Sequence, residues 1–323
     1  MVGKNSKPRQ ATTPSAAWIT RRPNQRANEP LVMNLSKTLS PILPKPFLVI
    51  ASACFVVGPA AAASYEWTFN SGNLSTSLGN GTMAYADAQS GTLTSFGTTG
   101  GGVPNIGGNV ANYMYVPAFA NPANGYHLTF NNTAPNGGGA YVNDYTVLFD
   151  VLVPGPWPID YIVPFFNTDP ANGNDADFYL YGDGEIGIGS GYSAPNTMLP
   201  NTWYRVGFVA SASTLSYYVN GSLVASRAGG GVDGRWSLFS NLDAGPDLLL
   251  FNEGDLSGQY THELYLNSVA FVDQAMTSGQ LLALGGPNSV SILPVPEPTT
   301  INLVVLGLLA ARGLCARSKP IRR

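Results

Sequence analysis

The chain has 323 residues, including 37 glycines, 25 prolines and two cysteines, and its formal net charge is −3. Residues 64–293 contain no lysine, three arginines and 17 of the 19 acidic residues, so this region alone carries a charge of −14. That sign excludes nucleic acid as a partner, because phosphate binding needs clustered Lys and Arg. Cys54 and Cys315 lie outside this region, which excludes a disulfide, a thiolate metal site and a cysteine nucleophile within it.

The first 63 residues combine a polar segment with an export signal. Residues 1–32 are polar and basic without apolar periodicity, which predicts a disordered arm or a start codon assigned too far upstream. Met33 offers a second start, followed by lysines and an apolar run from Phe47 to Val57. We therefore predict a signal peptide over residues 33–63. The alternative is an N-terminal membrane helix, although this run is shorter than the roughly 20 residues of a span.

Small residues at the end of this segment mark the predicted cleavage site. Ala61 and Ala63 are the small residues that signal peptidase requires beside the scissile bond. Cleavage after Ala63 makes Ser64 the first residue of the mature protein. The remaining domain of about 220 residues is long enough to bury a sizeable core as one all-β unit.

Residues 64–286 contain apolar and aromatic runs of strand length between turn residues, which predicts an all-β domain. The clearest predicted strands are residues 144–153, 178–180, 186–188, 203–210, 215–219, 222–225, 247–251 and 263–272. Asn220 and Gly221 predict a two-residue type I′ hairpin turn, because both residues tolerate positive φ. The chain shows no alternation of strands with helices, which disfavours a parallel α/β fold.

One helix is predicted, from Met276 to Leu284. Thr277 or Ser278 provides its N-cap, and the glycine pair at residues 285–286 ends it. Many short strands closed by one short helix indicate a sandwich or a barrel.

The second half of the domain resembles the laminin-G-like, concanavalin-A-like jelly roll. The resemblance is carried by a Trp-led strand, a hairpin, a late strand and the closing helix, which are Trp203–Val206, Leu215–Val219, Asn220-Gly221, Ser222–Val224, Glu263–Phe271 and Met276–Leu281. It covers roughly residues 65–286 and is vague in the first half. Gln280 and Leu281 depart from the family, which often has an acid and Ile there. The resemblance implies an antiparallel two-sheet jelly-roll sandwich over residues 64–286.

Catalytic residues are poorly represented. In β-glucanase relatives of this fold, a Glu-x-Asp pair and a following Glu lie on one strand, and hydrolysis needs two suitably spaced carboxylates. Here Glu253 and Asp255 form the Glu-x-Asp pair that could serve, but Ser257 and Gly258 follow in place of the third acid. With only His127 and His262, and no Gly-x-Ser-x-Gly elbow, a Ser-His-Asp triad is also unsupported. We predict a protein that is not an enzyme.

A cluster of Asx residues predicts a calcium site. Asp169, Asp175 and Asp177 lie near Asn172 and Asn174 in a Pro/Gly-containing loop. Calcium takes six to eight oxygen ligands, which carboxylates, amides and carbonyls of such a loop can supply. The alternative is an Asx-rich turn that caps its own backbone. No other cofactor is predicted.

Exposed aromatic side chains are the expected stacking surfaces for a glycan. Trp67 and Trp203 are expected in the core. The candidates for sugar binding are Tyr113, Tyr115, Trp157, Tyr192 and Trp236.

The C-terminus is predicted to be a sorting signal. Residues 287–298 read as a linker ending in Pro296, Glu297 and Pro298, followed by an apolar helix at 299–316, interrupted by Arg312. A basic tail at 317–323 favours the cytoplasmic side of a membrane.

This order resembles the PEP-CTERM tail of bacterial exported proteins, which implies processing by a membrane-embedded exosortase. The alternative is a plain C-terminal membrane anchor.

Together these features predict an exported, non-catalytic protein of the cell surface or extracellular matrix. Its predicted processing partners are signal peptidase and exosortase, and it is held transiently in the inner membrane by its C-terminal helix. Its predicted ligand is an extracellular polysaccharide or another matrix component. The alternatives are a glycoside hydrolase or lyase on the same fold, and a purely structural surface protein.

Overall fold

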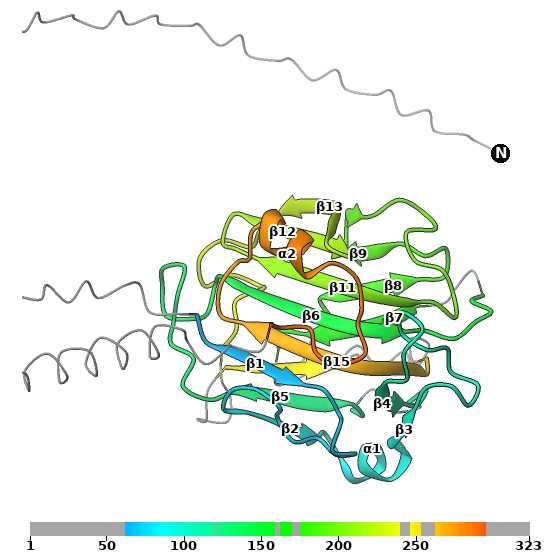
Figure 1. Ribbon diagram of the computed structural model, residues 1–323. Coiled ribbons are helices and arrows are strands. Elements are labelled where there is room, and N and C mark those ends of the chain that lie inside the picture. Colours follow the sequence, from blue (N-terminus) through cyan, green and yellow to red (C-terminus); the bar gives the residue numbers. More distant parts are fainter. Residues whose placement is uncertain are drawn as a thin grey trace, which may run out of the picture. The chain divides into compact units, whose positions relative to one another are not determined.

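The computed structural model describes residues 62–119, 121, 123–158, 162–169, 175–239, 246–252 and 262–294. Within these residues the chain forms 15 strands in two antiparallel sheets, together with two short helices (Figure 1). The predicted all-β, antiparallel two-sheet sandwich is therefore confirmed. The sorting motif at residues 296–298, the predicted C-terminal helix and nearly all of the predicted signal segment lie outside the described residues.

The larger sheet, sheet A, has eight strands. In spatial order they are β13 (Ser222–Ala228), β12 (Thr214–Val219), β11 (Trp203–Ala210), β6 (Tyr145–Leu152), β15 (Leu264–Val272), β4 (Asn112–Val116) and β3 (Ser95–Thr98). The remaining strand, β1 (Ser64–Trp67), also pairs with β15. β15 thus pairs with β6 along one side, while β4 and β1 divide its other side between them.

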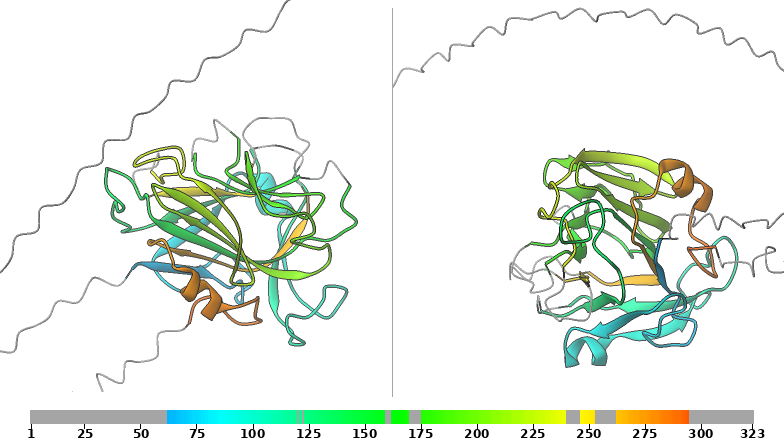
Figure 2. Two further views of the ribbon diagram at one scale, coloured as in Figure 1. Left: turned by 90° about the horizontal axis from the view of Figure 1, so that it is seen from above. Right: turned by 90° about the vertical axis from the view of Figure 1, so that its left-hand side faces the viewer.

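Sheet B has seven strands and packs against sheet A (Figure 2). In spatial order they are β10 (Gly191–Tyr192), β9 (Ile186–Ile188), β8 (Phe178–Tyr181), β7 (Ile162–Asn167), β14 (Asp247–Leu250), β5 (Tyr126–Phe130) and β2 (Gly81–Tyr85). The helices are α1 (Ala88–Leu93) and α2 (Ser278–Leu284).

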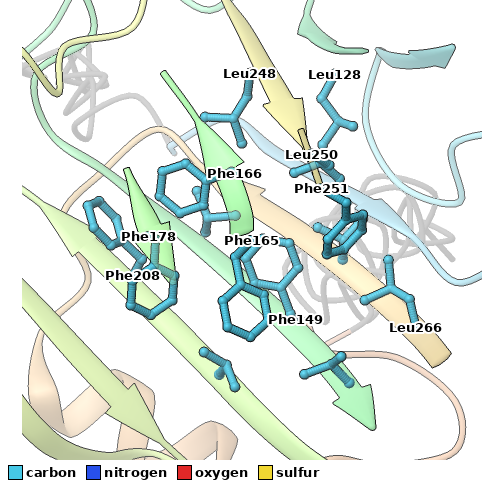
Figure 3. Packing of buried hydrophobic residues seen from close by; sticks show 14 of the residues in the cluster. Leu128, Phe149, Phe165, Phe166, Phe178, Phe208, Leu248, Leu250, Phe251 and Leu266 are labelled. Carbon is cyan, nitrogen blue, oxygen red and sulfur yellow. The ribbon is translucent and has the colours of Figure 1, made fainter. Parts of the chain in front are cut away.

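Aromatic side chains fill the space between the sheets (Figure 3). Phe149 and Phe208 from sheet A meet Phe165, Phe166 and Phe178 from sheet B, and each of the five is almost completely buried. The ring centroids of Phe166 and Phe208 lie 4.8 Å apart in an edge-to-face arrangement, which is favourable for aromatic quadrupoles. Alternation along the strands places Phe149, Phe178 and Phe208 inside, whereas a register shift between Pro164 and Phe166 turns both Phe165 and Phe166 inward.

The local predictions in the second half agree closely with the structure. The strand predicted over residues 203–210 is β11 with the same bounds. The hairpin turn has φ of 50° at Asn220 and 80° at Gly221, as a type I′ turn requires. Thr277 caps α2, and Gln280 completes a capping box.

The segment after α2 lies along sheet A rather than leaving the domain. Residues 287–294, which we name the C-terminal strap and which were predicted as the start of a linker, run across the outer face of sheet A. Ile292 and Leu293 pack there against Leu148, Ala270 and Val272. In the part of the chain that the structure describes, neither helix has the length and apolarity of a membrane span.

Candidate functional site

Three tyrosines form a continuous surface on the outer face of sheet A. Tyr113 and Tyr115 flank Met114 on β4, and since Met114 is fully buried in the core, both tyrosines face outward. Tyr265 on β15 is the direct cross-strand partner of Tyr115. The centroid of the Tyr265 ring lies 5.0 Å from that of Tyr113 and 5.5 Å from that of Tyr115. We name Tyr113, Tyr115 and Tyr265 platform A.

Platform A is held in place by the rest of the sheet. Cross-strand partners extend this surface across the sheet: Tyr265 pairs with Leu152 on β6, and Leu152 pairs with Trp203 on β11. The Trp203 Nε1–H group donates to the carbonyl oxygen of Pro104 at 2.7 Å, and the loop that contains Val103 packs on the Trp203 end of this surface. The three tyrosines remain half-buried, so their rings are braced on one side and reach solvent on the other.

A carboxylate borders platform A. The Tyr115 hydroxyl donates to Glu263 Oε2 at 2.6 Å. Partial burial, followed by the charge and hydrogen bond of Glu263, raises the pKa of Tyr115 well above its usual value. Tyr115 therefore stays protonated at physiological pH and acts as a donor, while Glu263 offers acceptor oxygens to hydroxyl groups.

The other predicted stacking residues lie elsewhere. Tyr192 lies on β10 in sheet B, and its ring packs against Tyr181. Trp157 is half-buried, and its Nε1–H group donates to the carbonyl oxygen of Pro154 at 2.8 Å. The Arg227 guanidinium lies 5.0 Å above the ring of Trp236, so that ring face already has a cationic partner. Of the five predicted aromatics, only Tyr113 and Tyr115 come together.

Tyr265 and Glu263 complete the site but were not among the predicted ligand residues. Both lie in the predicted strand 263–272, where the alternation places Tyr265 on the face opposite Leu264 and Leu266. That alternation was readable in the sequence. The pairing of β15 with β4 was not, because the two strands are about 150 residues apart.

The described residues show the surroundings of each predicted calcium ligand, and two of the three, Asp175 and Asp177, lie beside Arg235. Asp177 is buried: its Oδ2 accepts hydrogen bonds from the backbone and side chain of Thr168, and its Oδ1 accepts one from Arg235 Nε at 3.0 Å. Asp169 donates its backbone N–H to Asn167. The backbone carbonyl oxygen of Asp175 lies 3.5 Å from Arg235. The loop at residues 170–174 lies outside the described residues, so the calcium site stays a prediction.

Of the four residues considered for catalysis, only His127 and His262 are among the described residues. Glu253 and Asp255 lie outside them. His127 lies on β5 in sheet B, whereas His262 precedes β15 in sheet A, and burial lowers the pKa of both imidazoles. Among the described residues, no group of three or more His, Cys, Asp or Glu side chains is arranged to hold a metal ion.

The predicted signal cleavage site is only partly described. Ser64 is the first residue of β1, and the Asp273 N–H donates to the carbonyl oxygen of Ala63 at 3.0 Å. Ala61 lies outside the described residues. The two residues on either side of the predicted cleavage bond are thus both bonded to the end of β15 or to the residue that follows it.

Comparison with known proteins gives distant similarities of fold. No protein-family model matches the sequence, and no curated protein matches it at a significant level. Among solved structures, the chain is similar to domain 4 of AbnA, a GH43 extracellular arabinanase from Geobacillus stearothermophilus in complex with arabinotriose. That pair shares 18% identity over 70% of this chain and 99% of that one, with a TM-score of 0.41.

Two binding domains of toxins are also similar. The botulinum neurotoxin serotype G binding domain shares 12% identity over 69% of this chain, with a TM-score of 0.44. The binding domain of Paraclostridial Mosquitocidal Protein 1 shares 14% identity over 60% of this chain, with a TM-score of 0.37. This chain spans about half the length of those two domains, 50% and 47% respectively. These similarities are too distant to assign a ligand or an activity.

Proposed function

We propose that this protein is an exported, non-catalytic β-sandwich of the laminin-G-like jelly-roll type that binds a neutral extracellular polysaccharide through platform A. The observation that carries the proposal is the association of Tyr113, Tyr115 and Tyr265 beside the carboxylate of Glu263. Tyrosine rings offer flat apolar faces to the C–H groups of a sugar, and their hydroxyls supply hydrogen bonds at the rim.

The charge of the domain favours a neutral glycan over an acidic one. Residues 64–293 carry a net charge of −14, and Glu263 lies directly at the platform. Carboxylates accept hydrogen bonds from sugar hydroxyls, whereas they repel uronate or sulfate groups.

The sequence supports the route by which the protein reaches its polysaccharide. We propose that signal peptidase cleaves after Ala63 and that an exosortase processes the chain near Pro296-Glu297-Pro298, with the apolar helix at 299–316 as a transient inner-membrane anchor. The product is then placed on the cell surface or in the extracellular matrix. Calcium bound by Asp169, Asp175 and Asp177 is a further proposal.

The binding proposal is tested by affinity electrophoresis and calorimetry of the purified protein on mixed-linkage β-glucan, arabinan, galactan and, as the acidic comparison, polygalacturonate. Tyr113→Ala is expected to weaken binding to a neutral glycan roughly 2- to 10-fold, because one stacking face is lost. Tyr113→Phe keeps the ring and is expected to bind nearly as the natural protein does.

Tyr141→Ala is the matched control, because Tyr141 is 39% exposed in a loop away from platform A. Binding that Tyr113→Ala leaves unchanged, or no binding to any neutral glycan, would overturn the proposal. Release of reducing ends from a bound glycan would instead favour the glycoside hydrolase.

A further inference from the structure

A second group of tyrosines lies on the outer face of sheet B. On β8, Phe178 and Leu180 point into the core, so Tyr179 and Tyr181 point outward. Tyr192 on β10 joins them: the ring centroids of Tyr181 and Tyr192 lie 4.8 Å apart in an edge-to-face arrangement, and those of Tyr179 and Tyr181 lie 6.2 Å apart. We name Tyr179, Tyr181 and Tyr192 platform B.

A glycine separates the tyrosines of platform B. Gly187 on β9 pairs with Tyr179 on one side and with Tyr192 on the other. Its φ is 155°, and a Cβ atom there would lie 2.2 Å from the carbonyl oxygen of Gly191. A side chain is therefore sterically excluded at this position. The absence of a side chain at the buried Gly187 lets the Tyr181 and Tyr192 rings meet on the outer face.

Platform B is braced from the other sheet. Arg227 on the edge strand β13 of sheet A donates from Nη1 to the carbonyl oxygen of Ile188 at 2.8 Å. Its side chain also lies against Gly191, where a Cβ atom would be 2.9 Å from the Arg227 Cβ. The short β9–β10 hairpin that carries Tyr192 is thus fastened to sheet A. A surface fixed before binding loses less entropy when a ligand is bound.

Tyr181 and Tyr192 remain accessible to a ligand. Both side chains are half-buried, whereas Tyr179 is 8% exposed and forms the base of the group. Burial, and then the hydrogen bond with Tyr181, raise the pKa of Tyr192 far above its usual value. The acidic hairpin residues Asp183 and Glu185 follow Tyr181 in the chain, and Arg227 on β13 lies beside Ile188, so charges of both signs lie near platform B.

The two platforms point away from each other. Platform A is on the outer face of sheet A, on β4 and β15, next to the edge strand β3. Platform B is on the outer face of sheet B, at the edge where Arg227 joins β13 to β9. They thus occupy opposite faces of the sandwich, and their strands lie toward opposite lateral edges, with β8 and β9 near β13 on one side and β4 near β3 on the other (Figure 1). A short glycan segment bound at one platform cannot also contact the other.

We infer that platform B is a second neutral-glycan site and that one molecule bridges two polysaccharide chains. This inference rests on the proposed function, since it extends the same chemistry to a second face. A protein with two weak sites binds a polysaccharide matrix with higher avidity than either site alone, although each site makes the same contacts as before. A bridging protein of this kind holds a polysaccharide network together, whereas a protein with one site only coats it.

The test measures stoichiometry and bridging with mixed-linkage β-glucan, arabinan and galactan, using the monomeric fraction of the purified protein. Calorimetry with oligosaccharides of each glycan is expected to give two sites per chain, and beads coated with the same glycan are expected to aggregate. Tyr192→Ala and Tyr113→Ala should each weaken one of the two sites roughly 2- to 10-fold and reduce aggregation, while the other site binds as before. The double variant should weaken both sites.

Tyr192→Phe is the matched control, because it keeps the ring, and unchanged thermal unfolding verifies that each variant is folded. One site per chain in the natural protein, or aggregation that Tyr192→Ala leaves intact, would overturn platform B while leaving the proposed function standing. If the natural protein binds none of the three glycans, both the proposed function and this inference fail.

Discussion

The Ser291 hydroxyl donates to Glu66 Oε2 at 2.7 Å, although the two residues are 225 positions apart in the chain. The backbone N–H groups of Ile292 and Leu293 also donate to the Glu66 carboxylate. Close by, the Asn288 N–H donates to Asp150 Oδ2 at 3.2 Å. The C-terminal strap thus supplies hydrogen bonds to two acidic side chains on sheet A that are almost inaccessible to solvent.

Removing the strap is expected to destabilise the sandwich. The side chains of Ile292 and Leu293 are almost fully buried, and burial of each stabilises by roughly 1.5–3 kcal/mol. The free energy of unfolding of a chain that ends at residue 285 should therefore be roughly 3–6 kcal/mol lower than that of a chain that ends at Pro294. Urea unfolding of the two forms measures the difference, and equal midpoints would show that the strap is dispensable.

The stability contributed by Glu66 is expected to depend on pH. Burial raises the pKa of Glu66 above its ordinary 4.5, despite the hydrogen bonds from the strap. The folded state then binds this proton more tightly than the unfolded state does. The stabilisation is complete below pH 4.5 and is lost as the pH rises through the folded-state pKa. Relative to Glu66→Gln, the natural protein should therefore gain stability on acidification.

Urea midpoints of both proteins between about pH 4 and pH 7 test this expectation. Ser291→Ala removes one hydrogen bond that favours the ionised carboxylate, so it should raise the pKa of Glu66 further and steepen the dependence. A stability difference between Glu66→Gln and the natural protein that stays constant over this range would contradict the assignment.

A buried ion pair lies under the strap. Arg205 donates from Nε and Nη2 to the two carboxylate oxygens of Asp150, each at 2.7 Å, and from Nη1 to the carbonyl oxygen of Leu284. Arg205→Met leaves a buried carboxylate without its partner, so a loss of about 3–5 kcal/mol is expected. The double variant Asp150→Leu with Arg205→Met should lose less, because no charge remains buried. Denaturant unfolding of the single and double variants forms the test.

The predicted calcium site and the ion pair between Asp177 and Arg235 can be tested separately. Asp177→Asn should lower the unfolding free energy by about 1–3 kcal/mol with or without calcium, because Thr168 and Arg235 lose a charged acceptor. If the loop binds calcium, the melting temperature of the natural protein should rise with calcium and fall with EDTA. Asp169→Asn and Asp175→Asn should then abolish that response. A melting temperature that does not change with calcium would contradict the calcium prediction.

Processing of the two ends is tested by the intact mass of the protein from native culture, with cells and medium analysed separately. We expect a chain that begins near Ser64 and ends near Pro296 to Thr299, recovered outside the cell. A mass that retains residues up to Arg323 would mean a plain membrane anchor, and the sorting proposal would be lost.

Prediction from sequence worked where a signal was local. The hairpin at Asn220 and Gly221 and the capped helix α2 each depend on residues within a few positions of one another. The first half was harder to interpret: α1, capped by Asp87, was not anticipated. It has only six residues and contains Gly91, so helix propensity gives little signal there.

The sequence by itself determined the fold class, the charge of the domain and the alternation that turns Tyr113 and Tyr115 away from Met114. Only the tertiary structure decided which tyrosines meet, because Tyr265 reaches Tyr115 through a pairing of strands far apart in the chain. It also decided that residues 287–294 belong to the sandwich, since their partners Glu66 and Asp150 come from the distant strands β1 and β6. Local propensity acts over a few residues, whereas sheet register and burial are set by the whole chain at once.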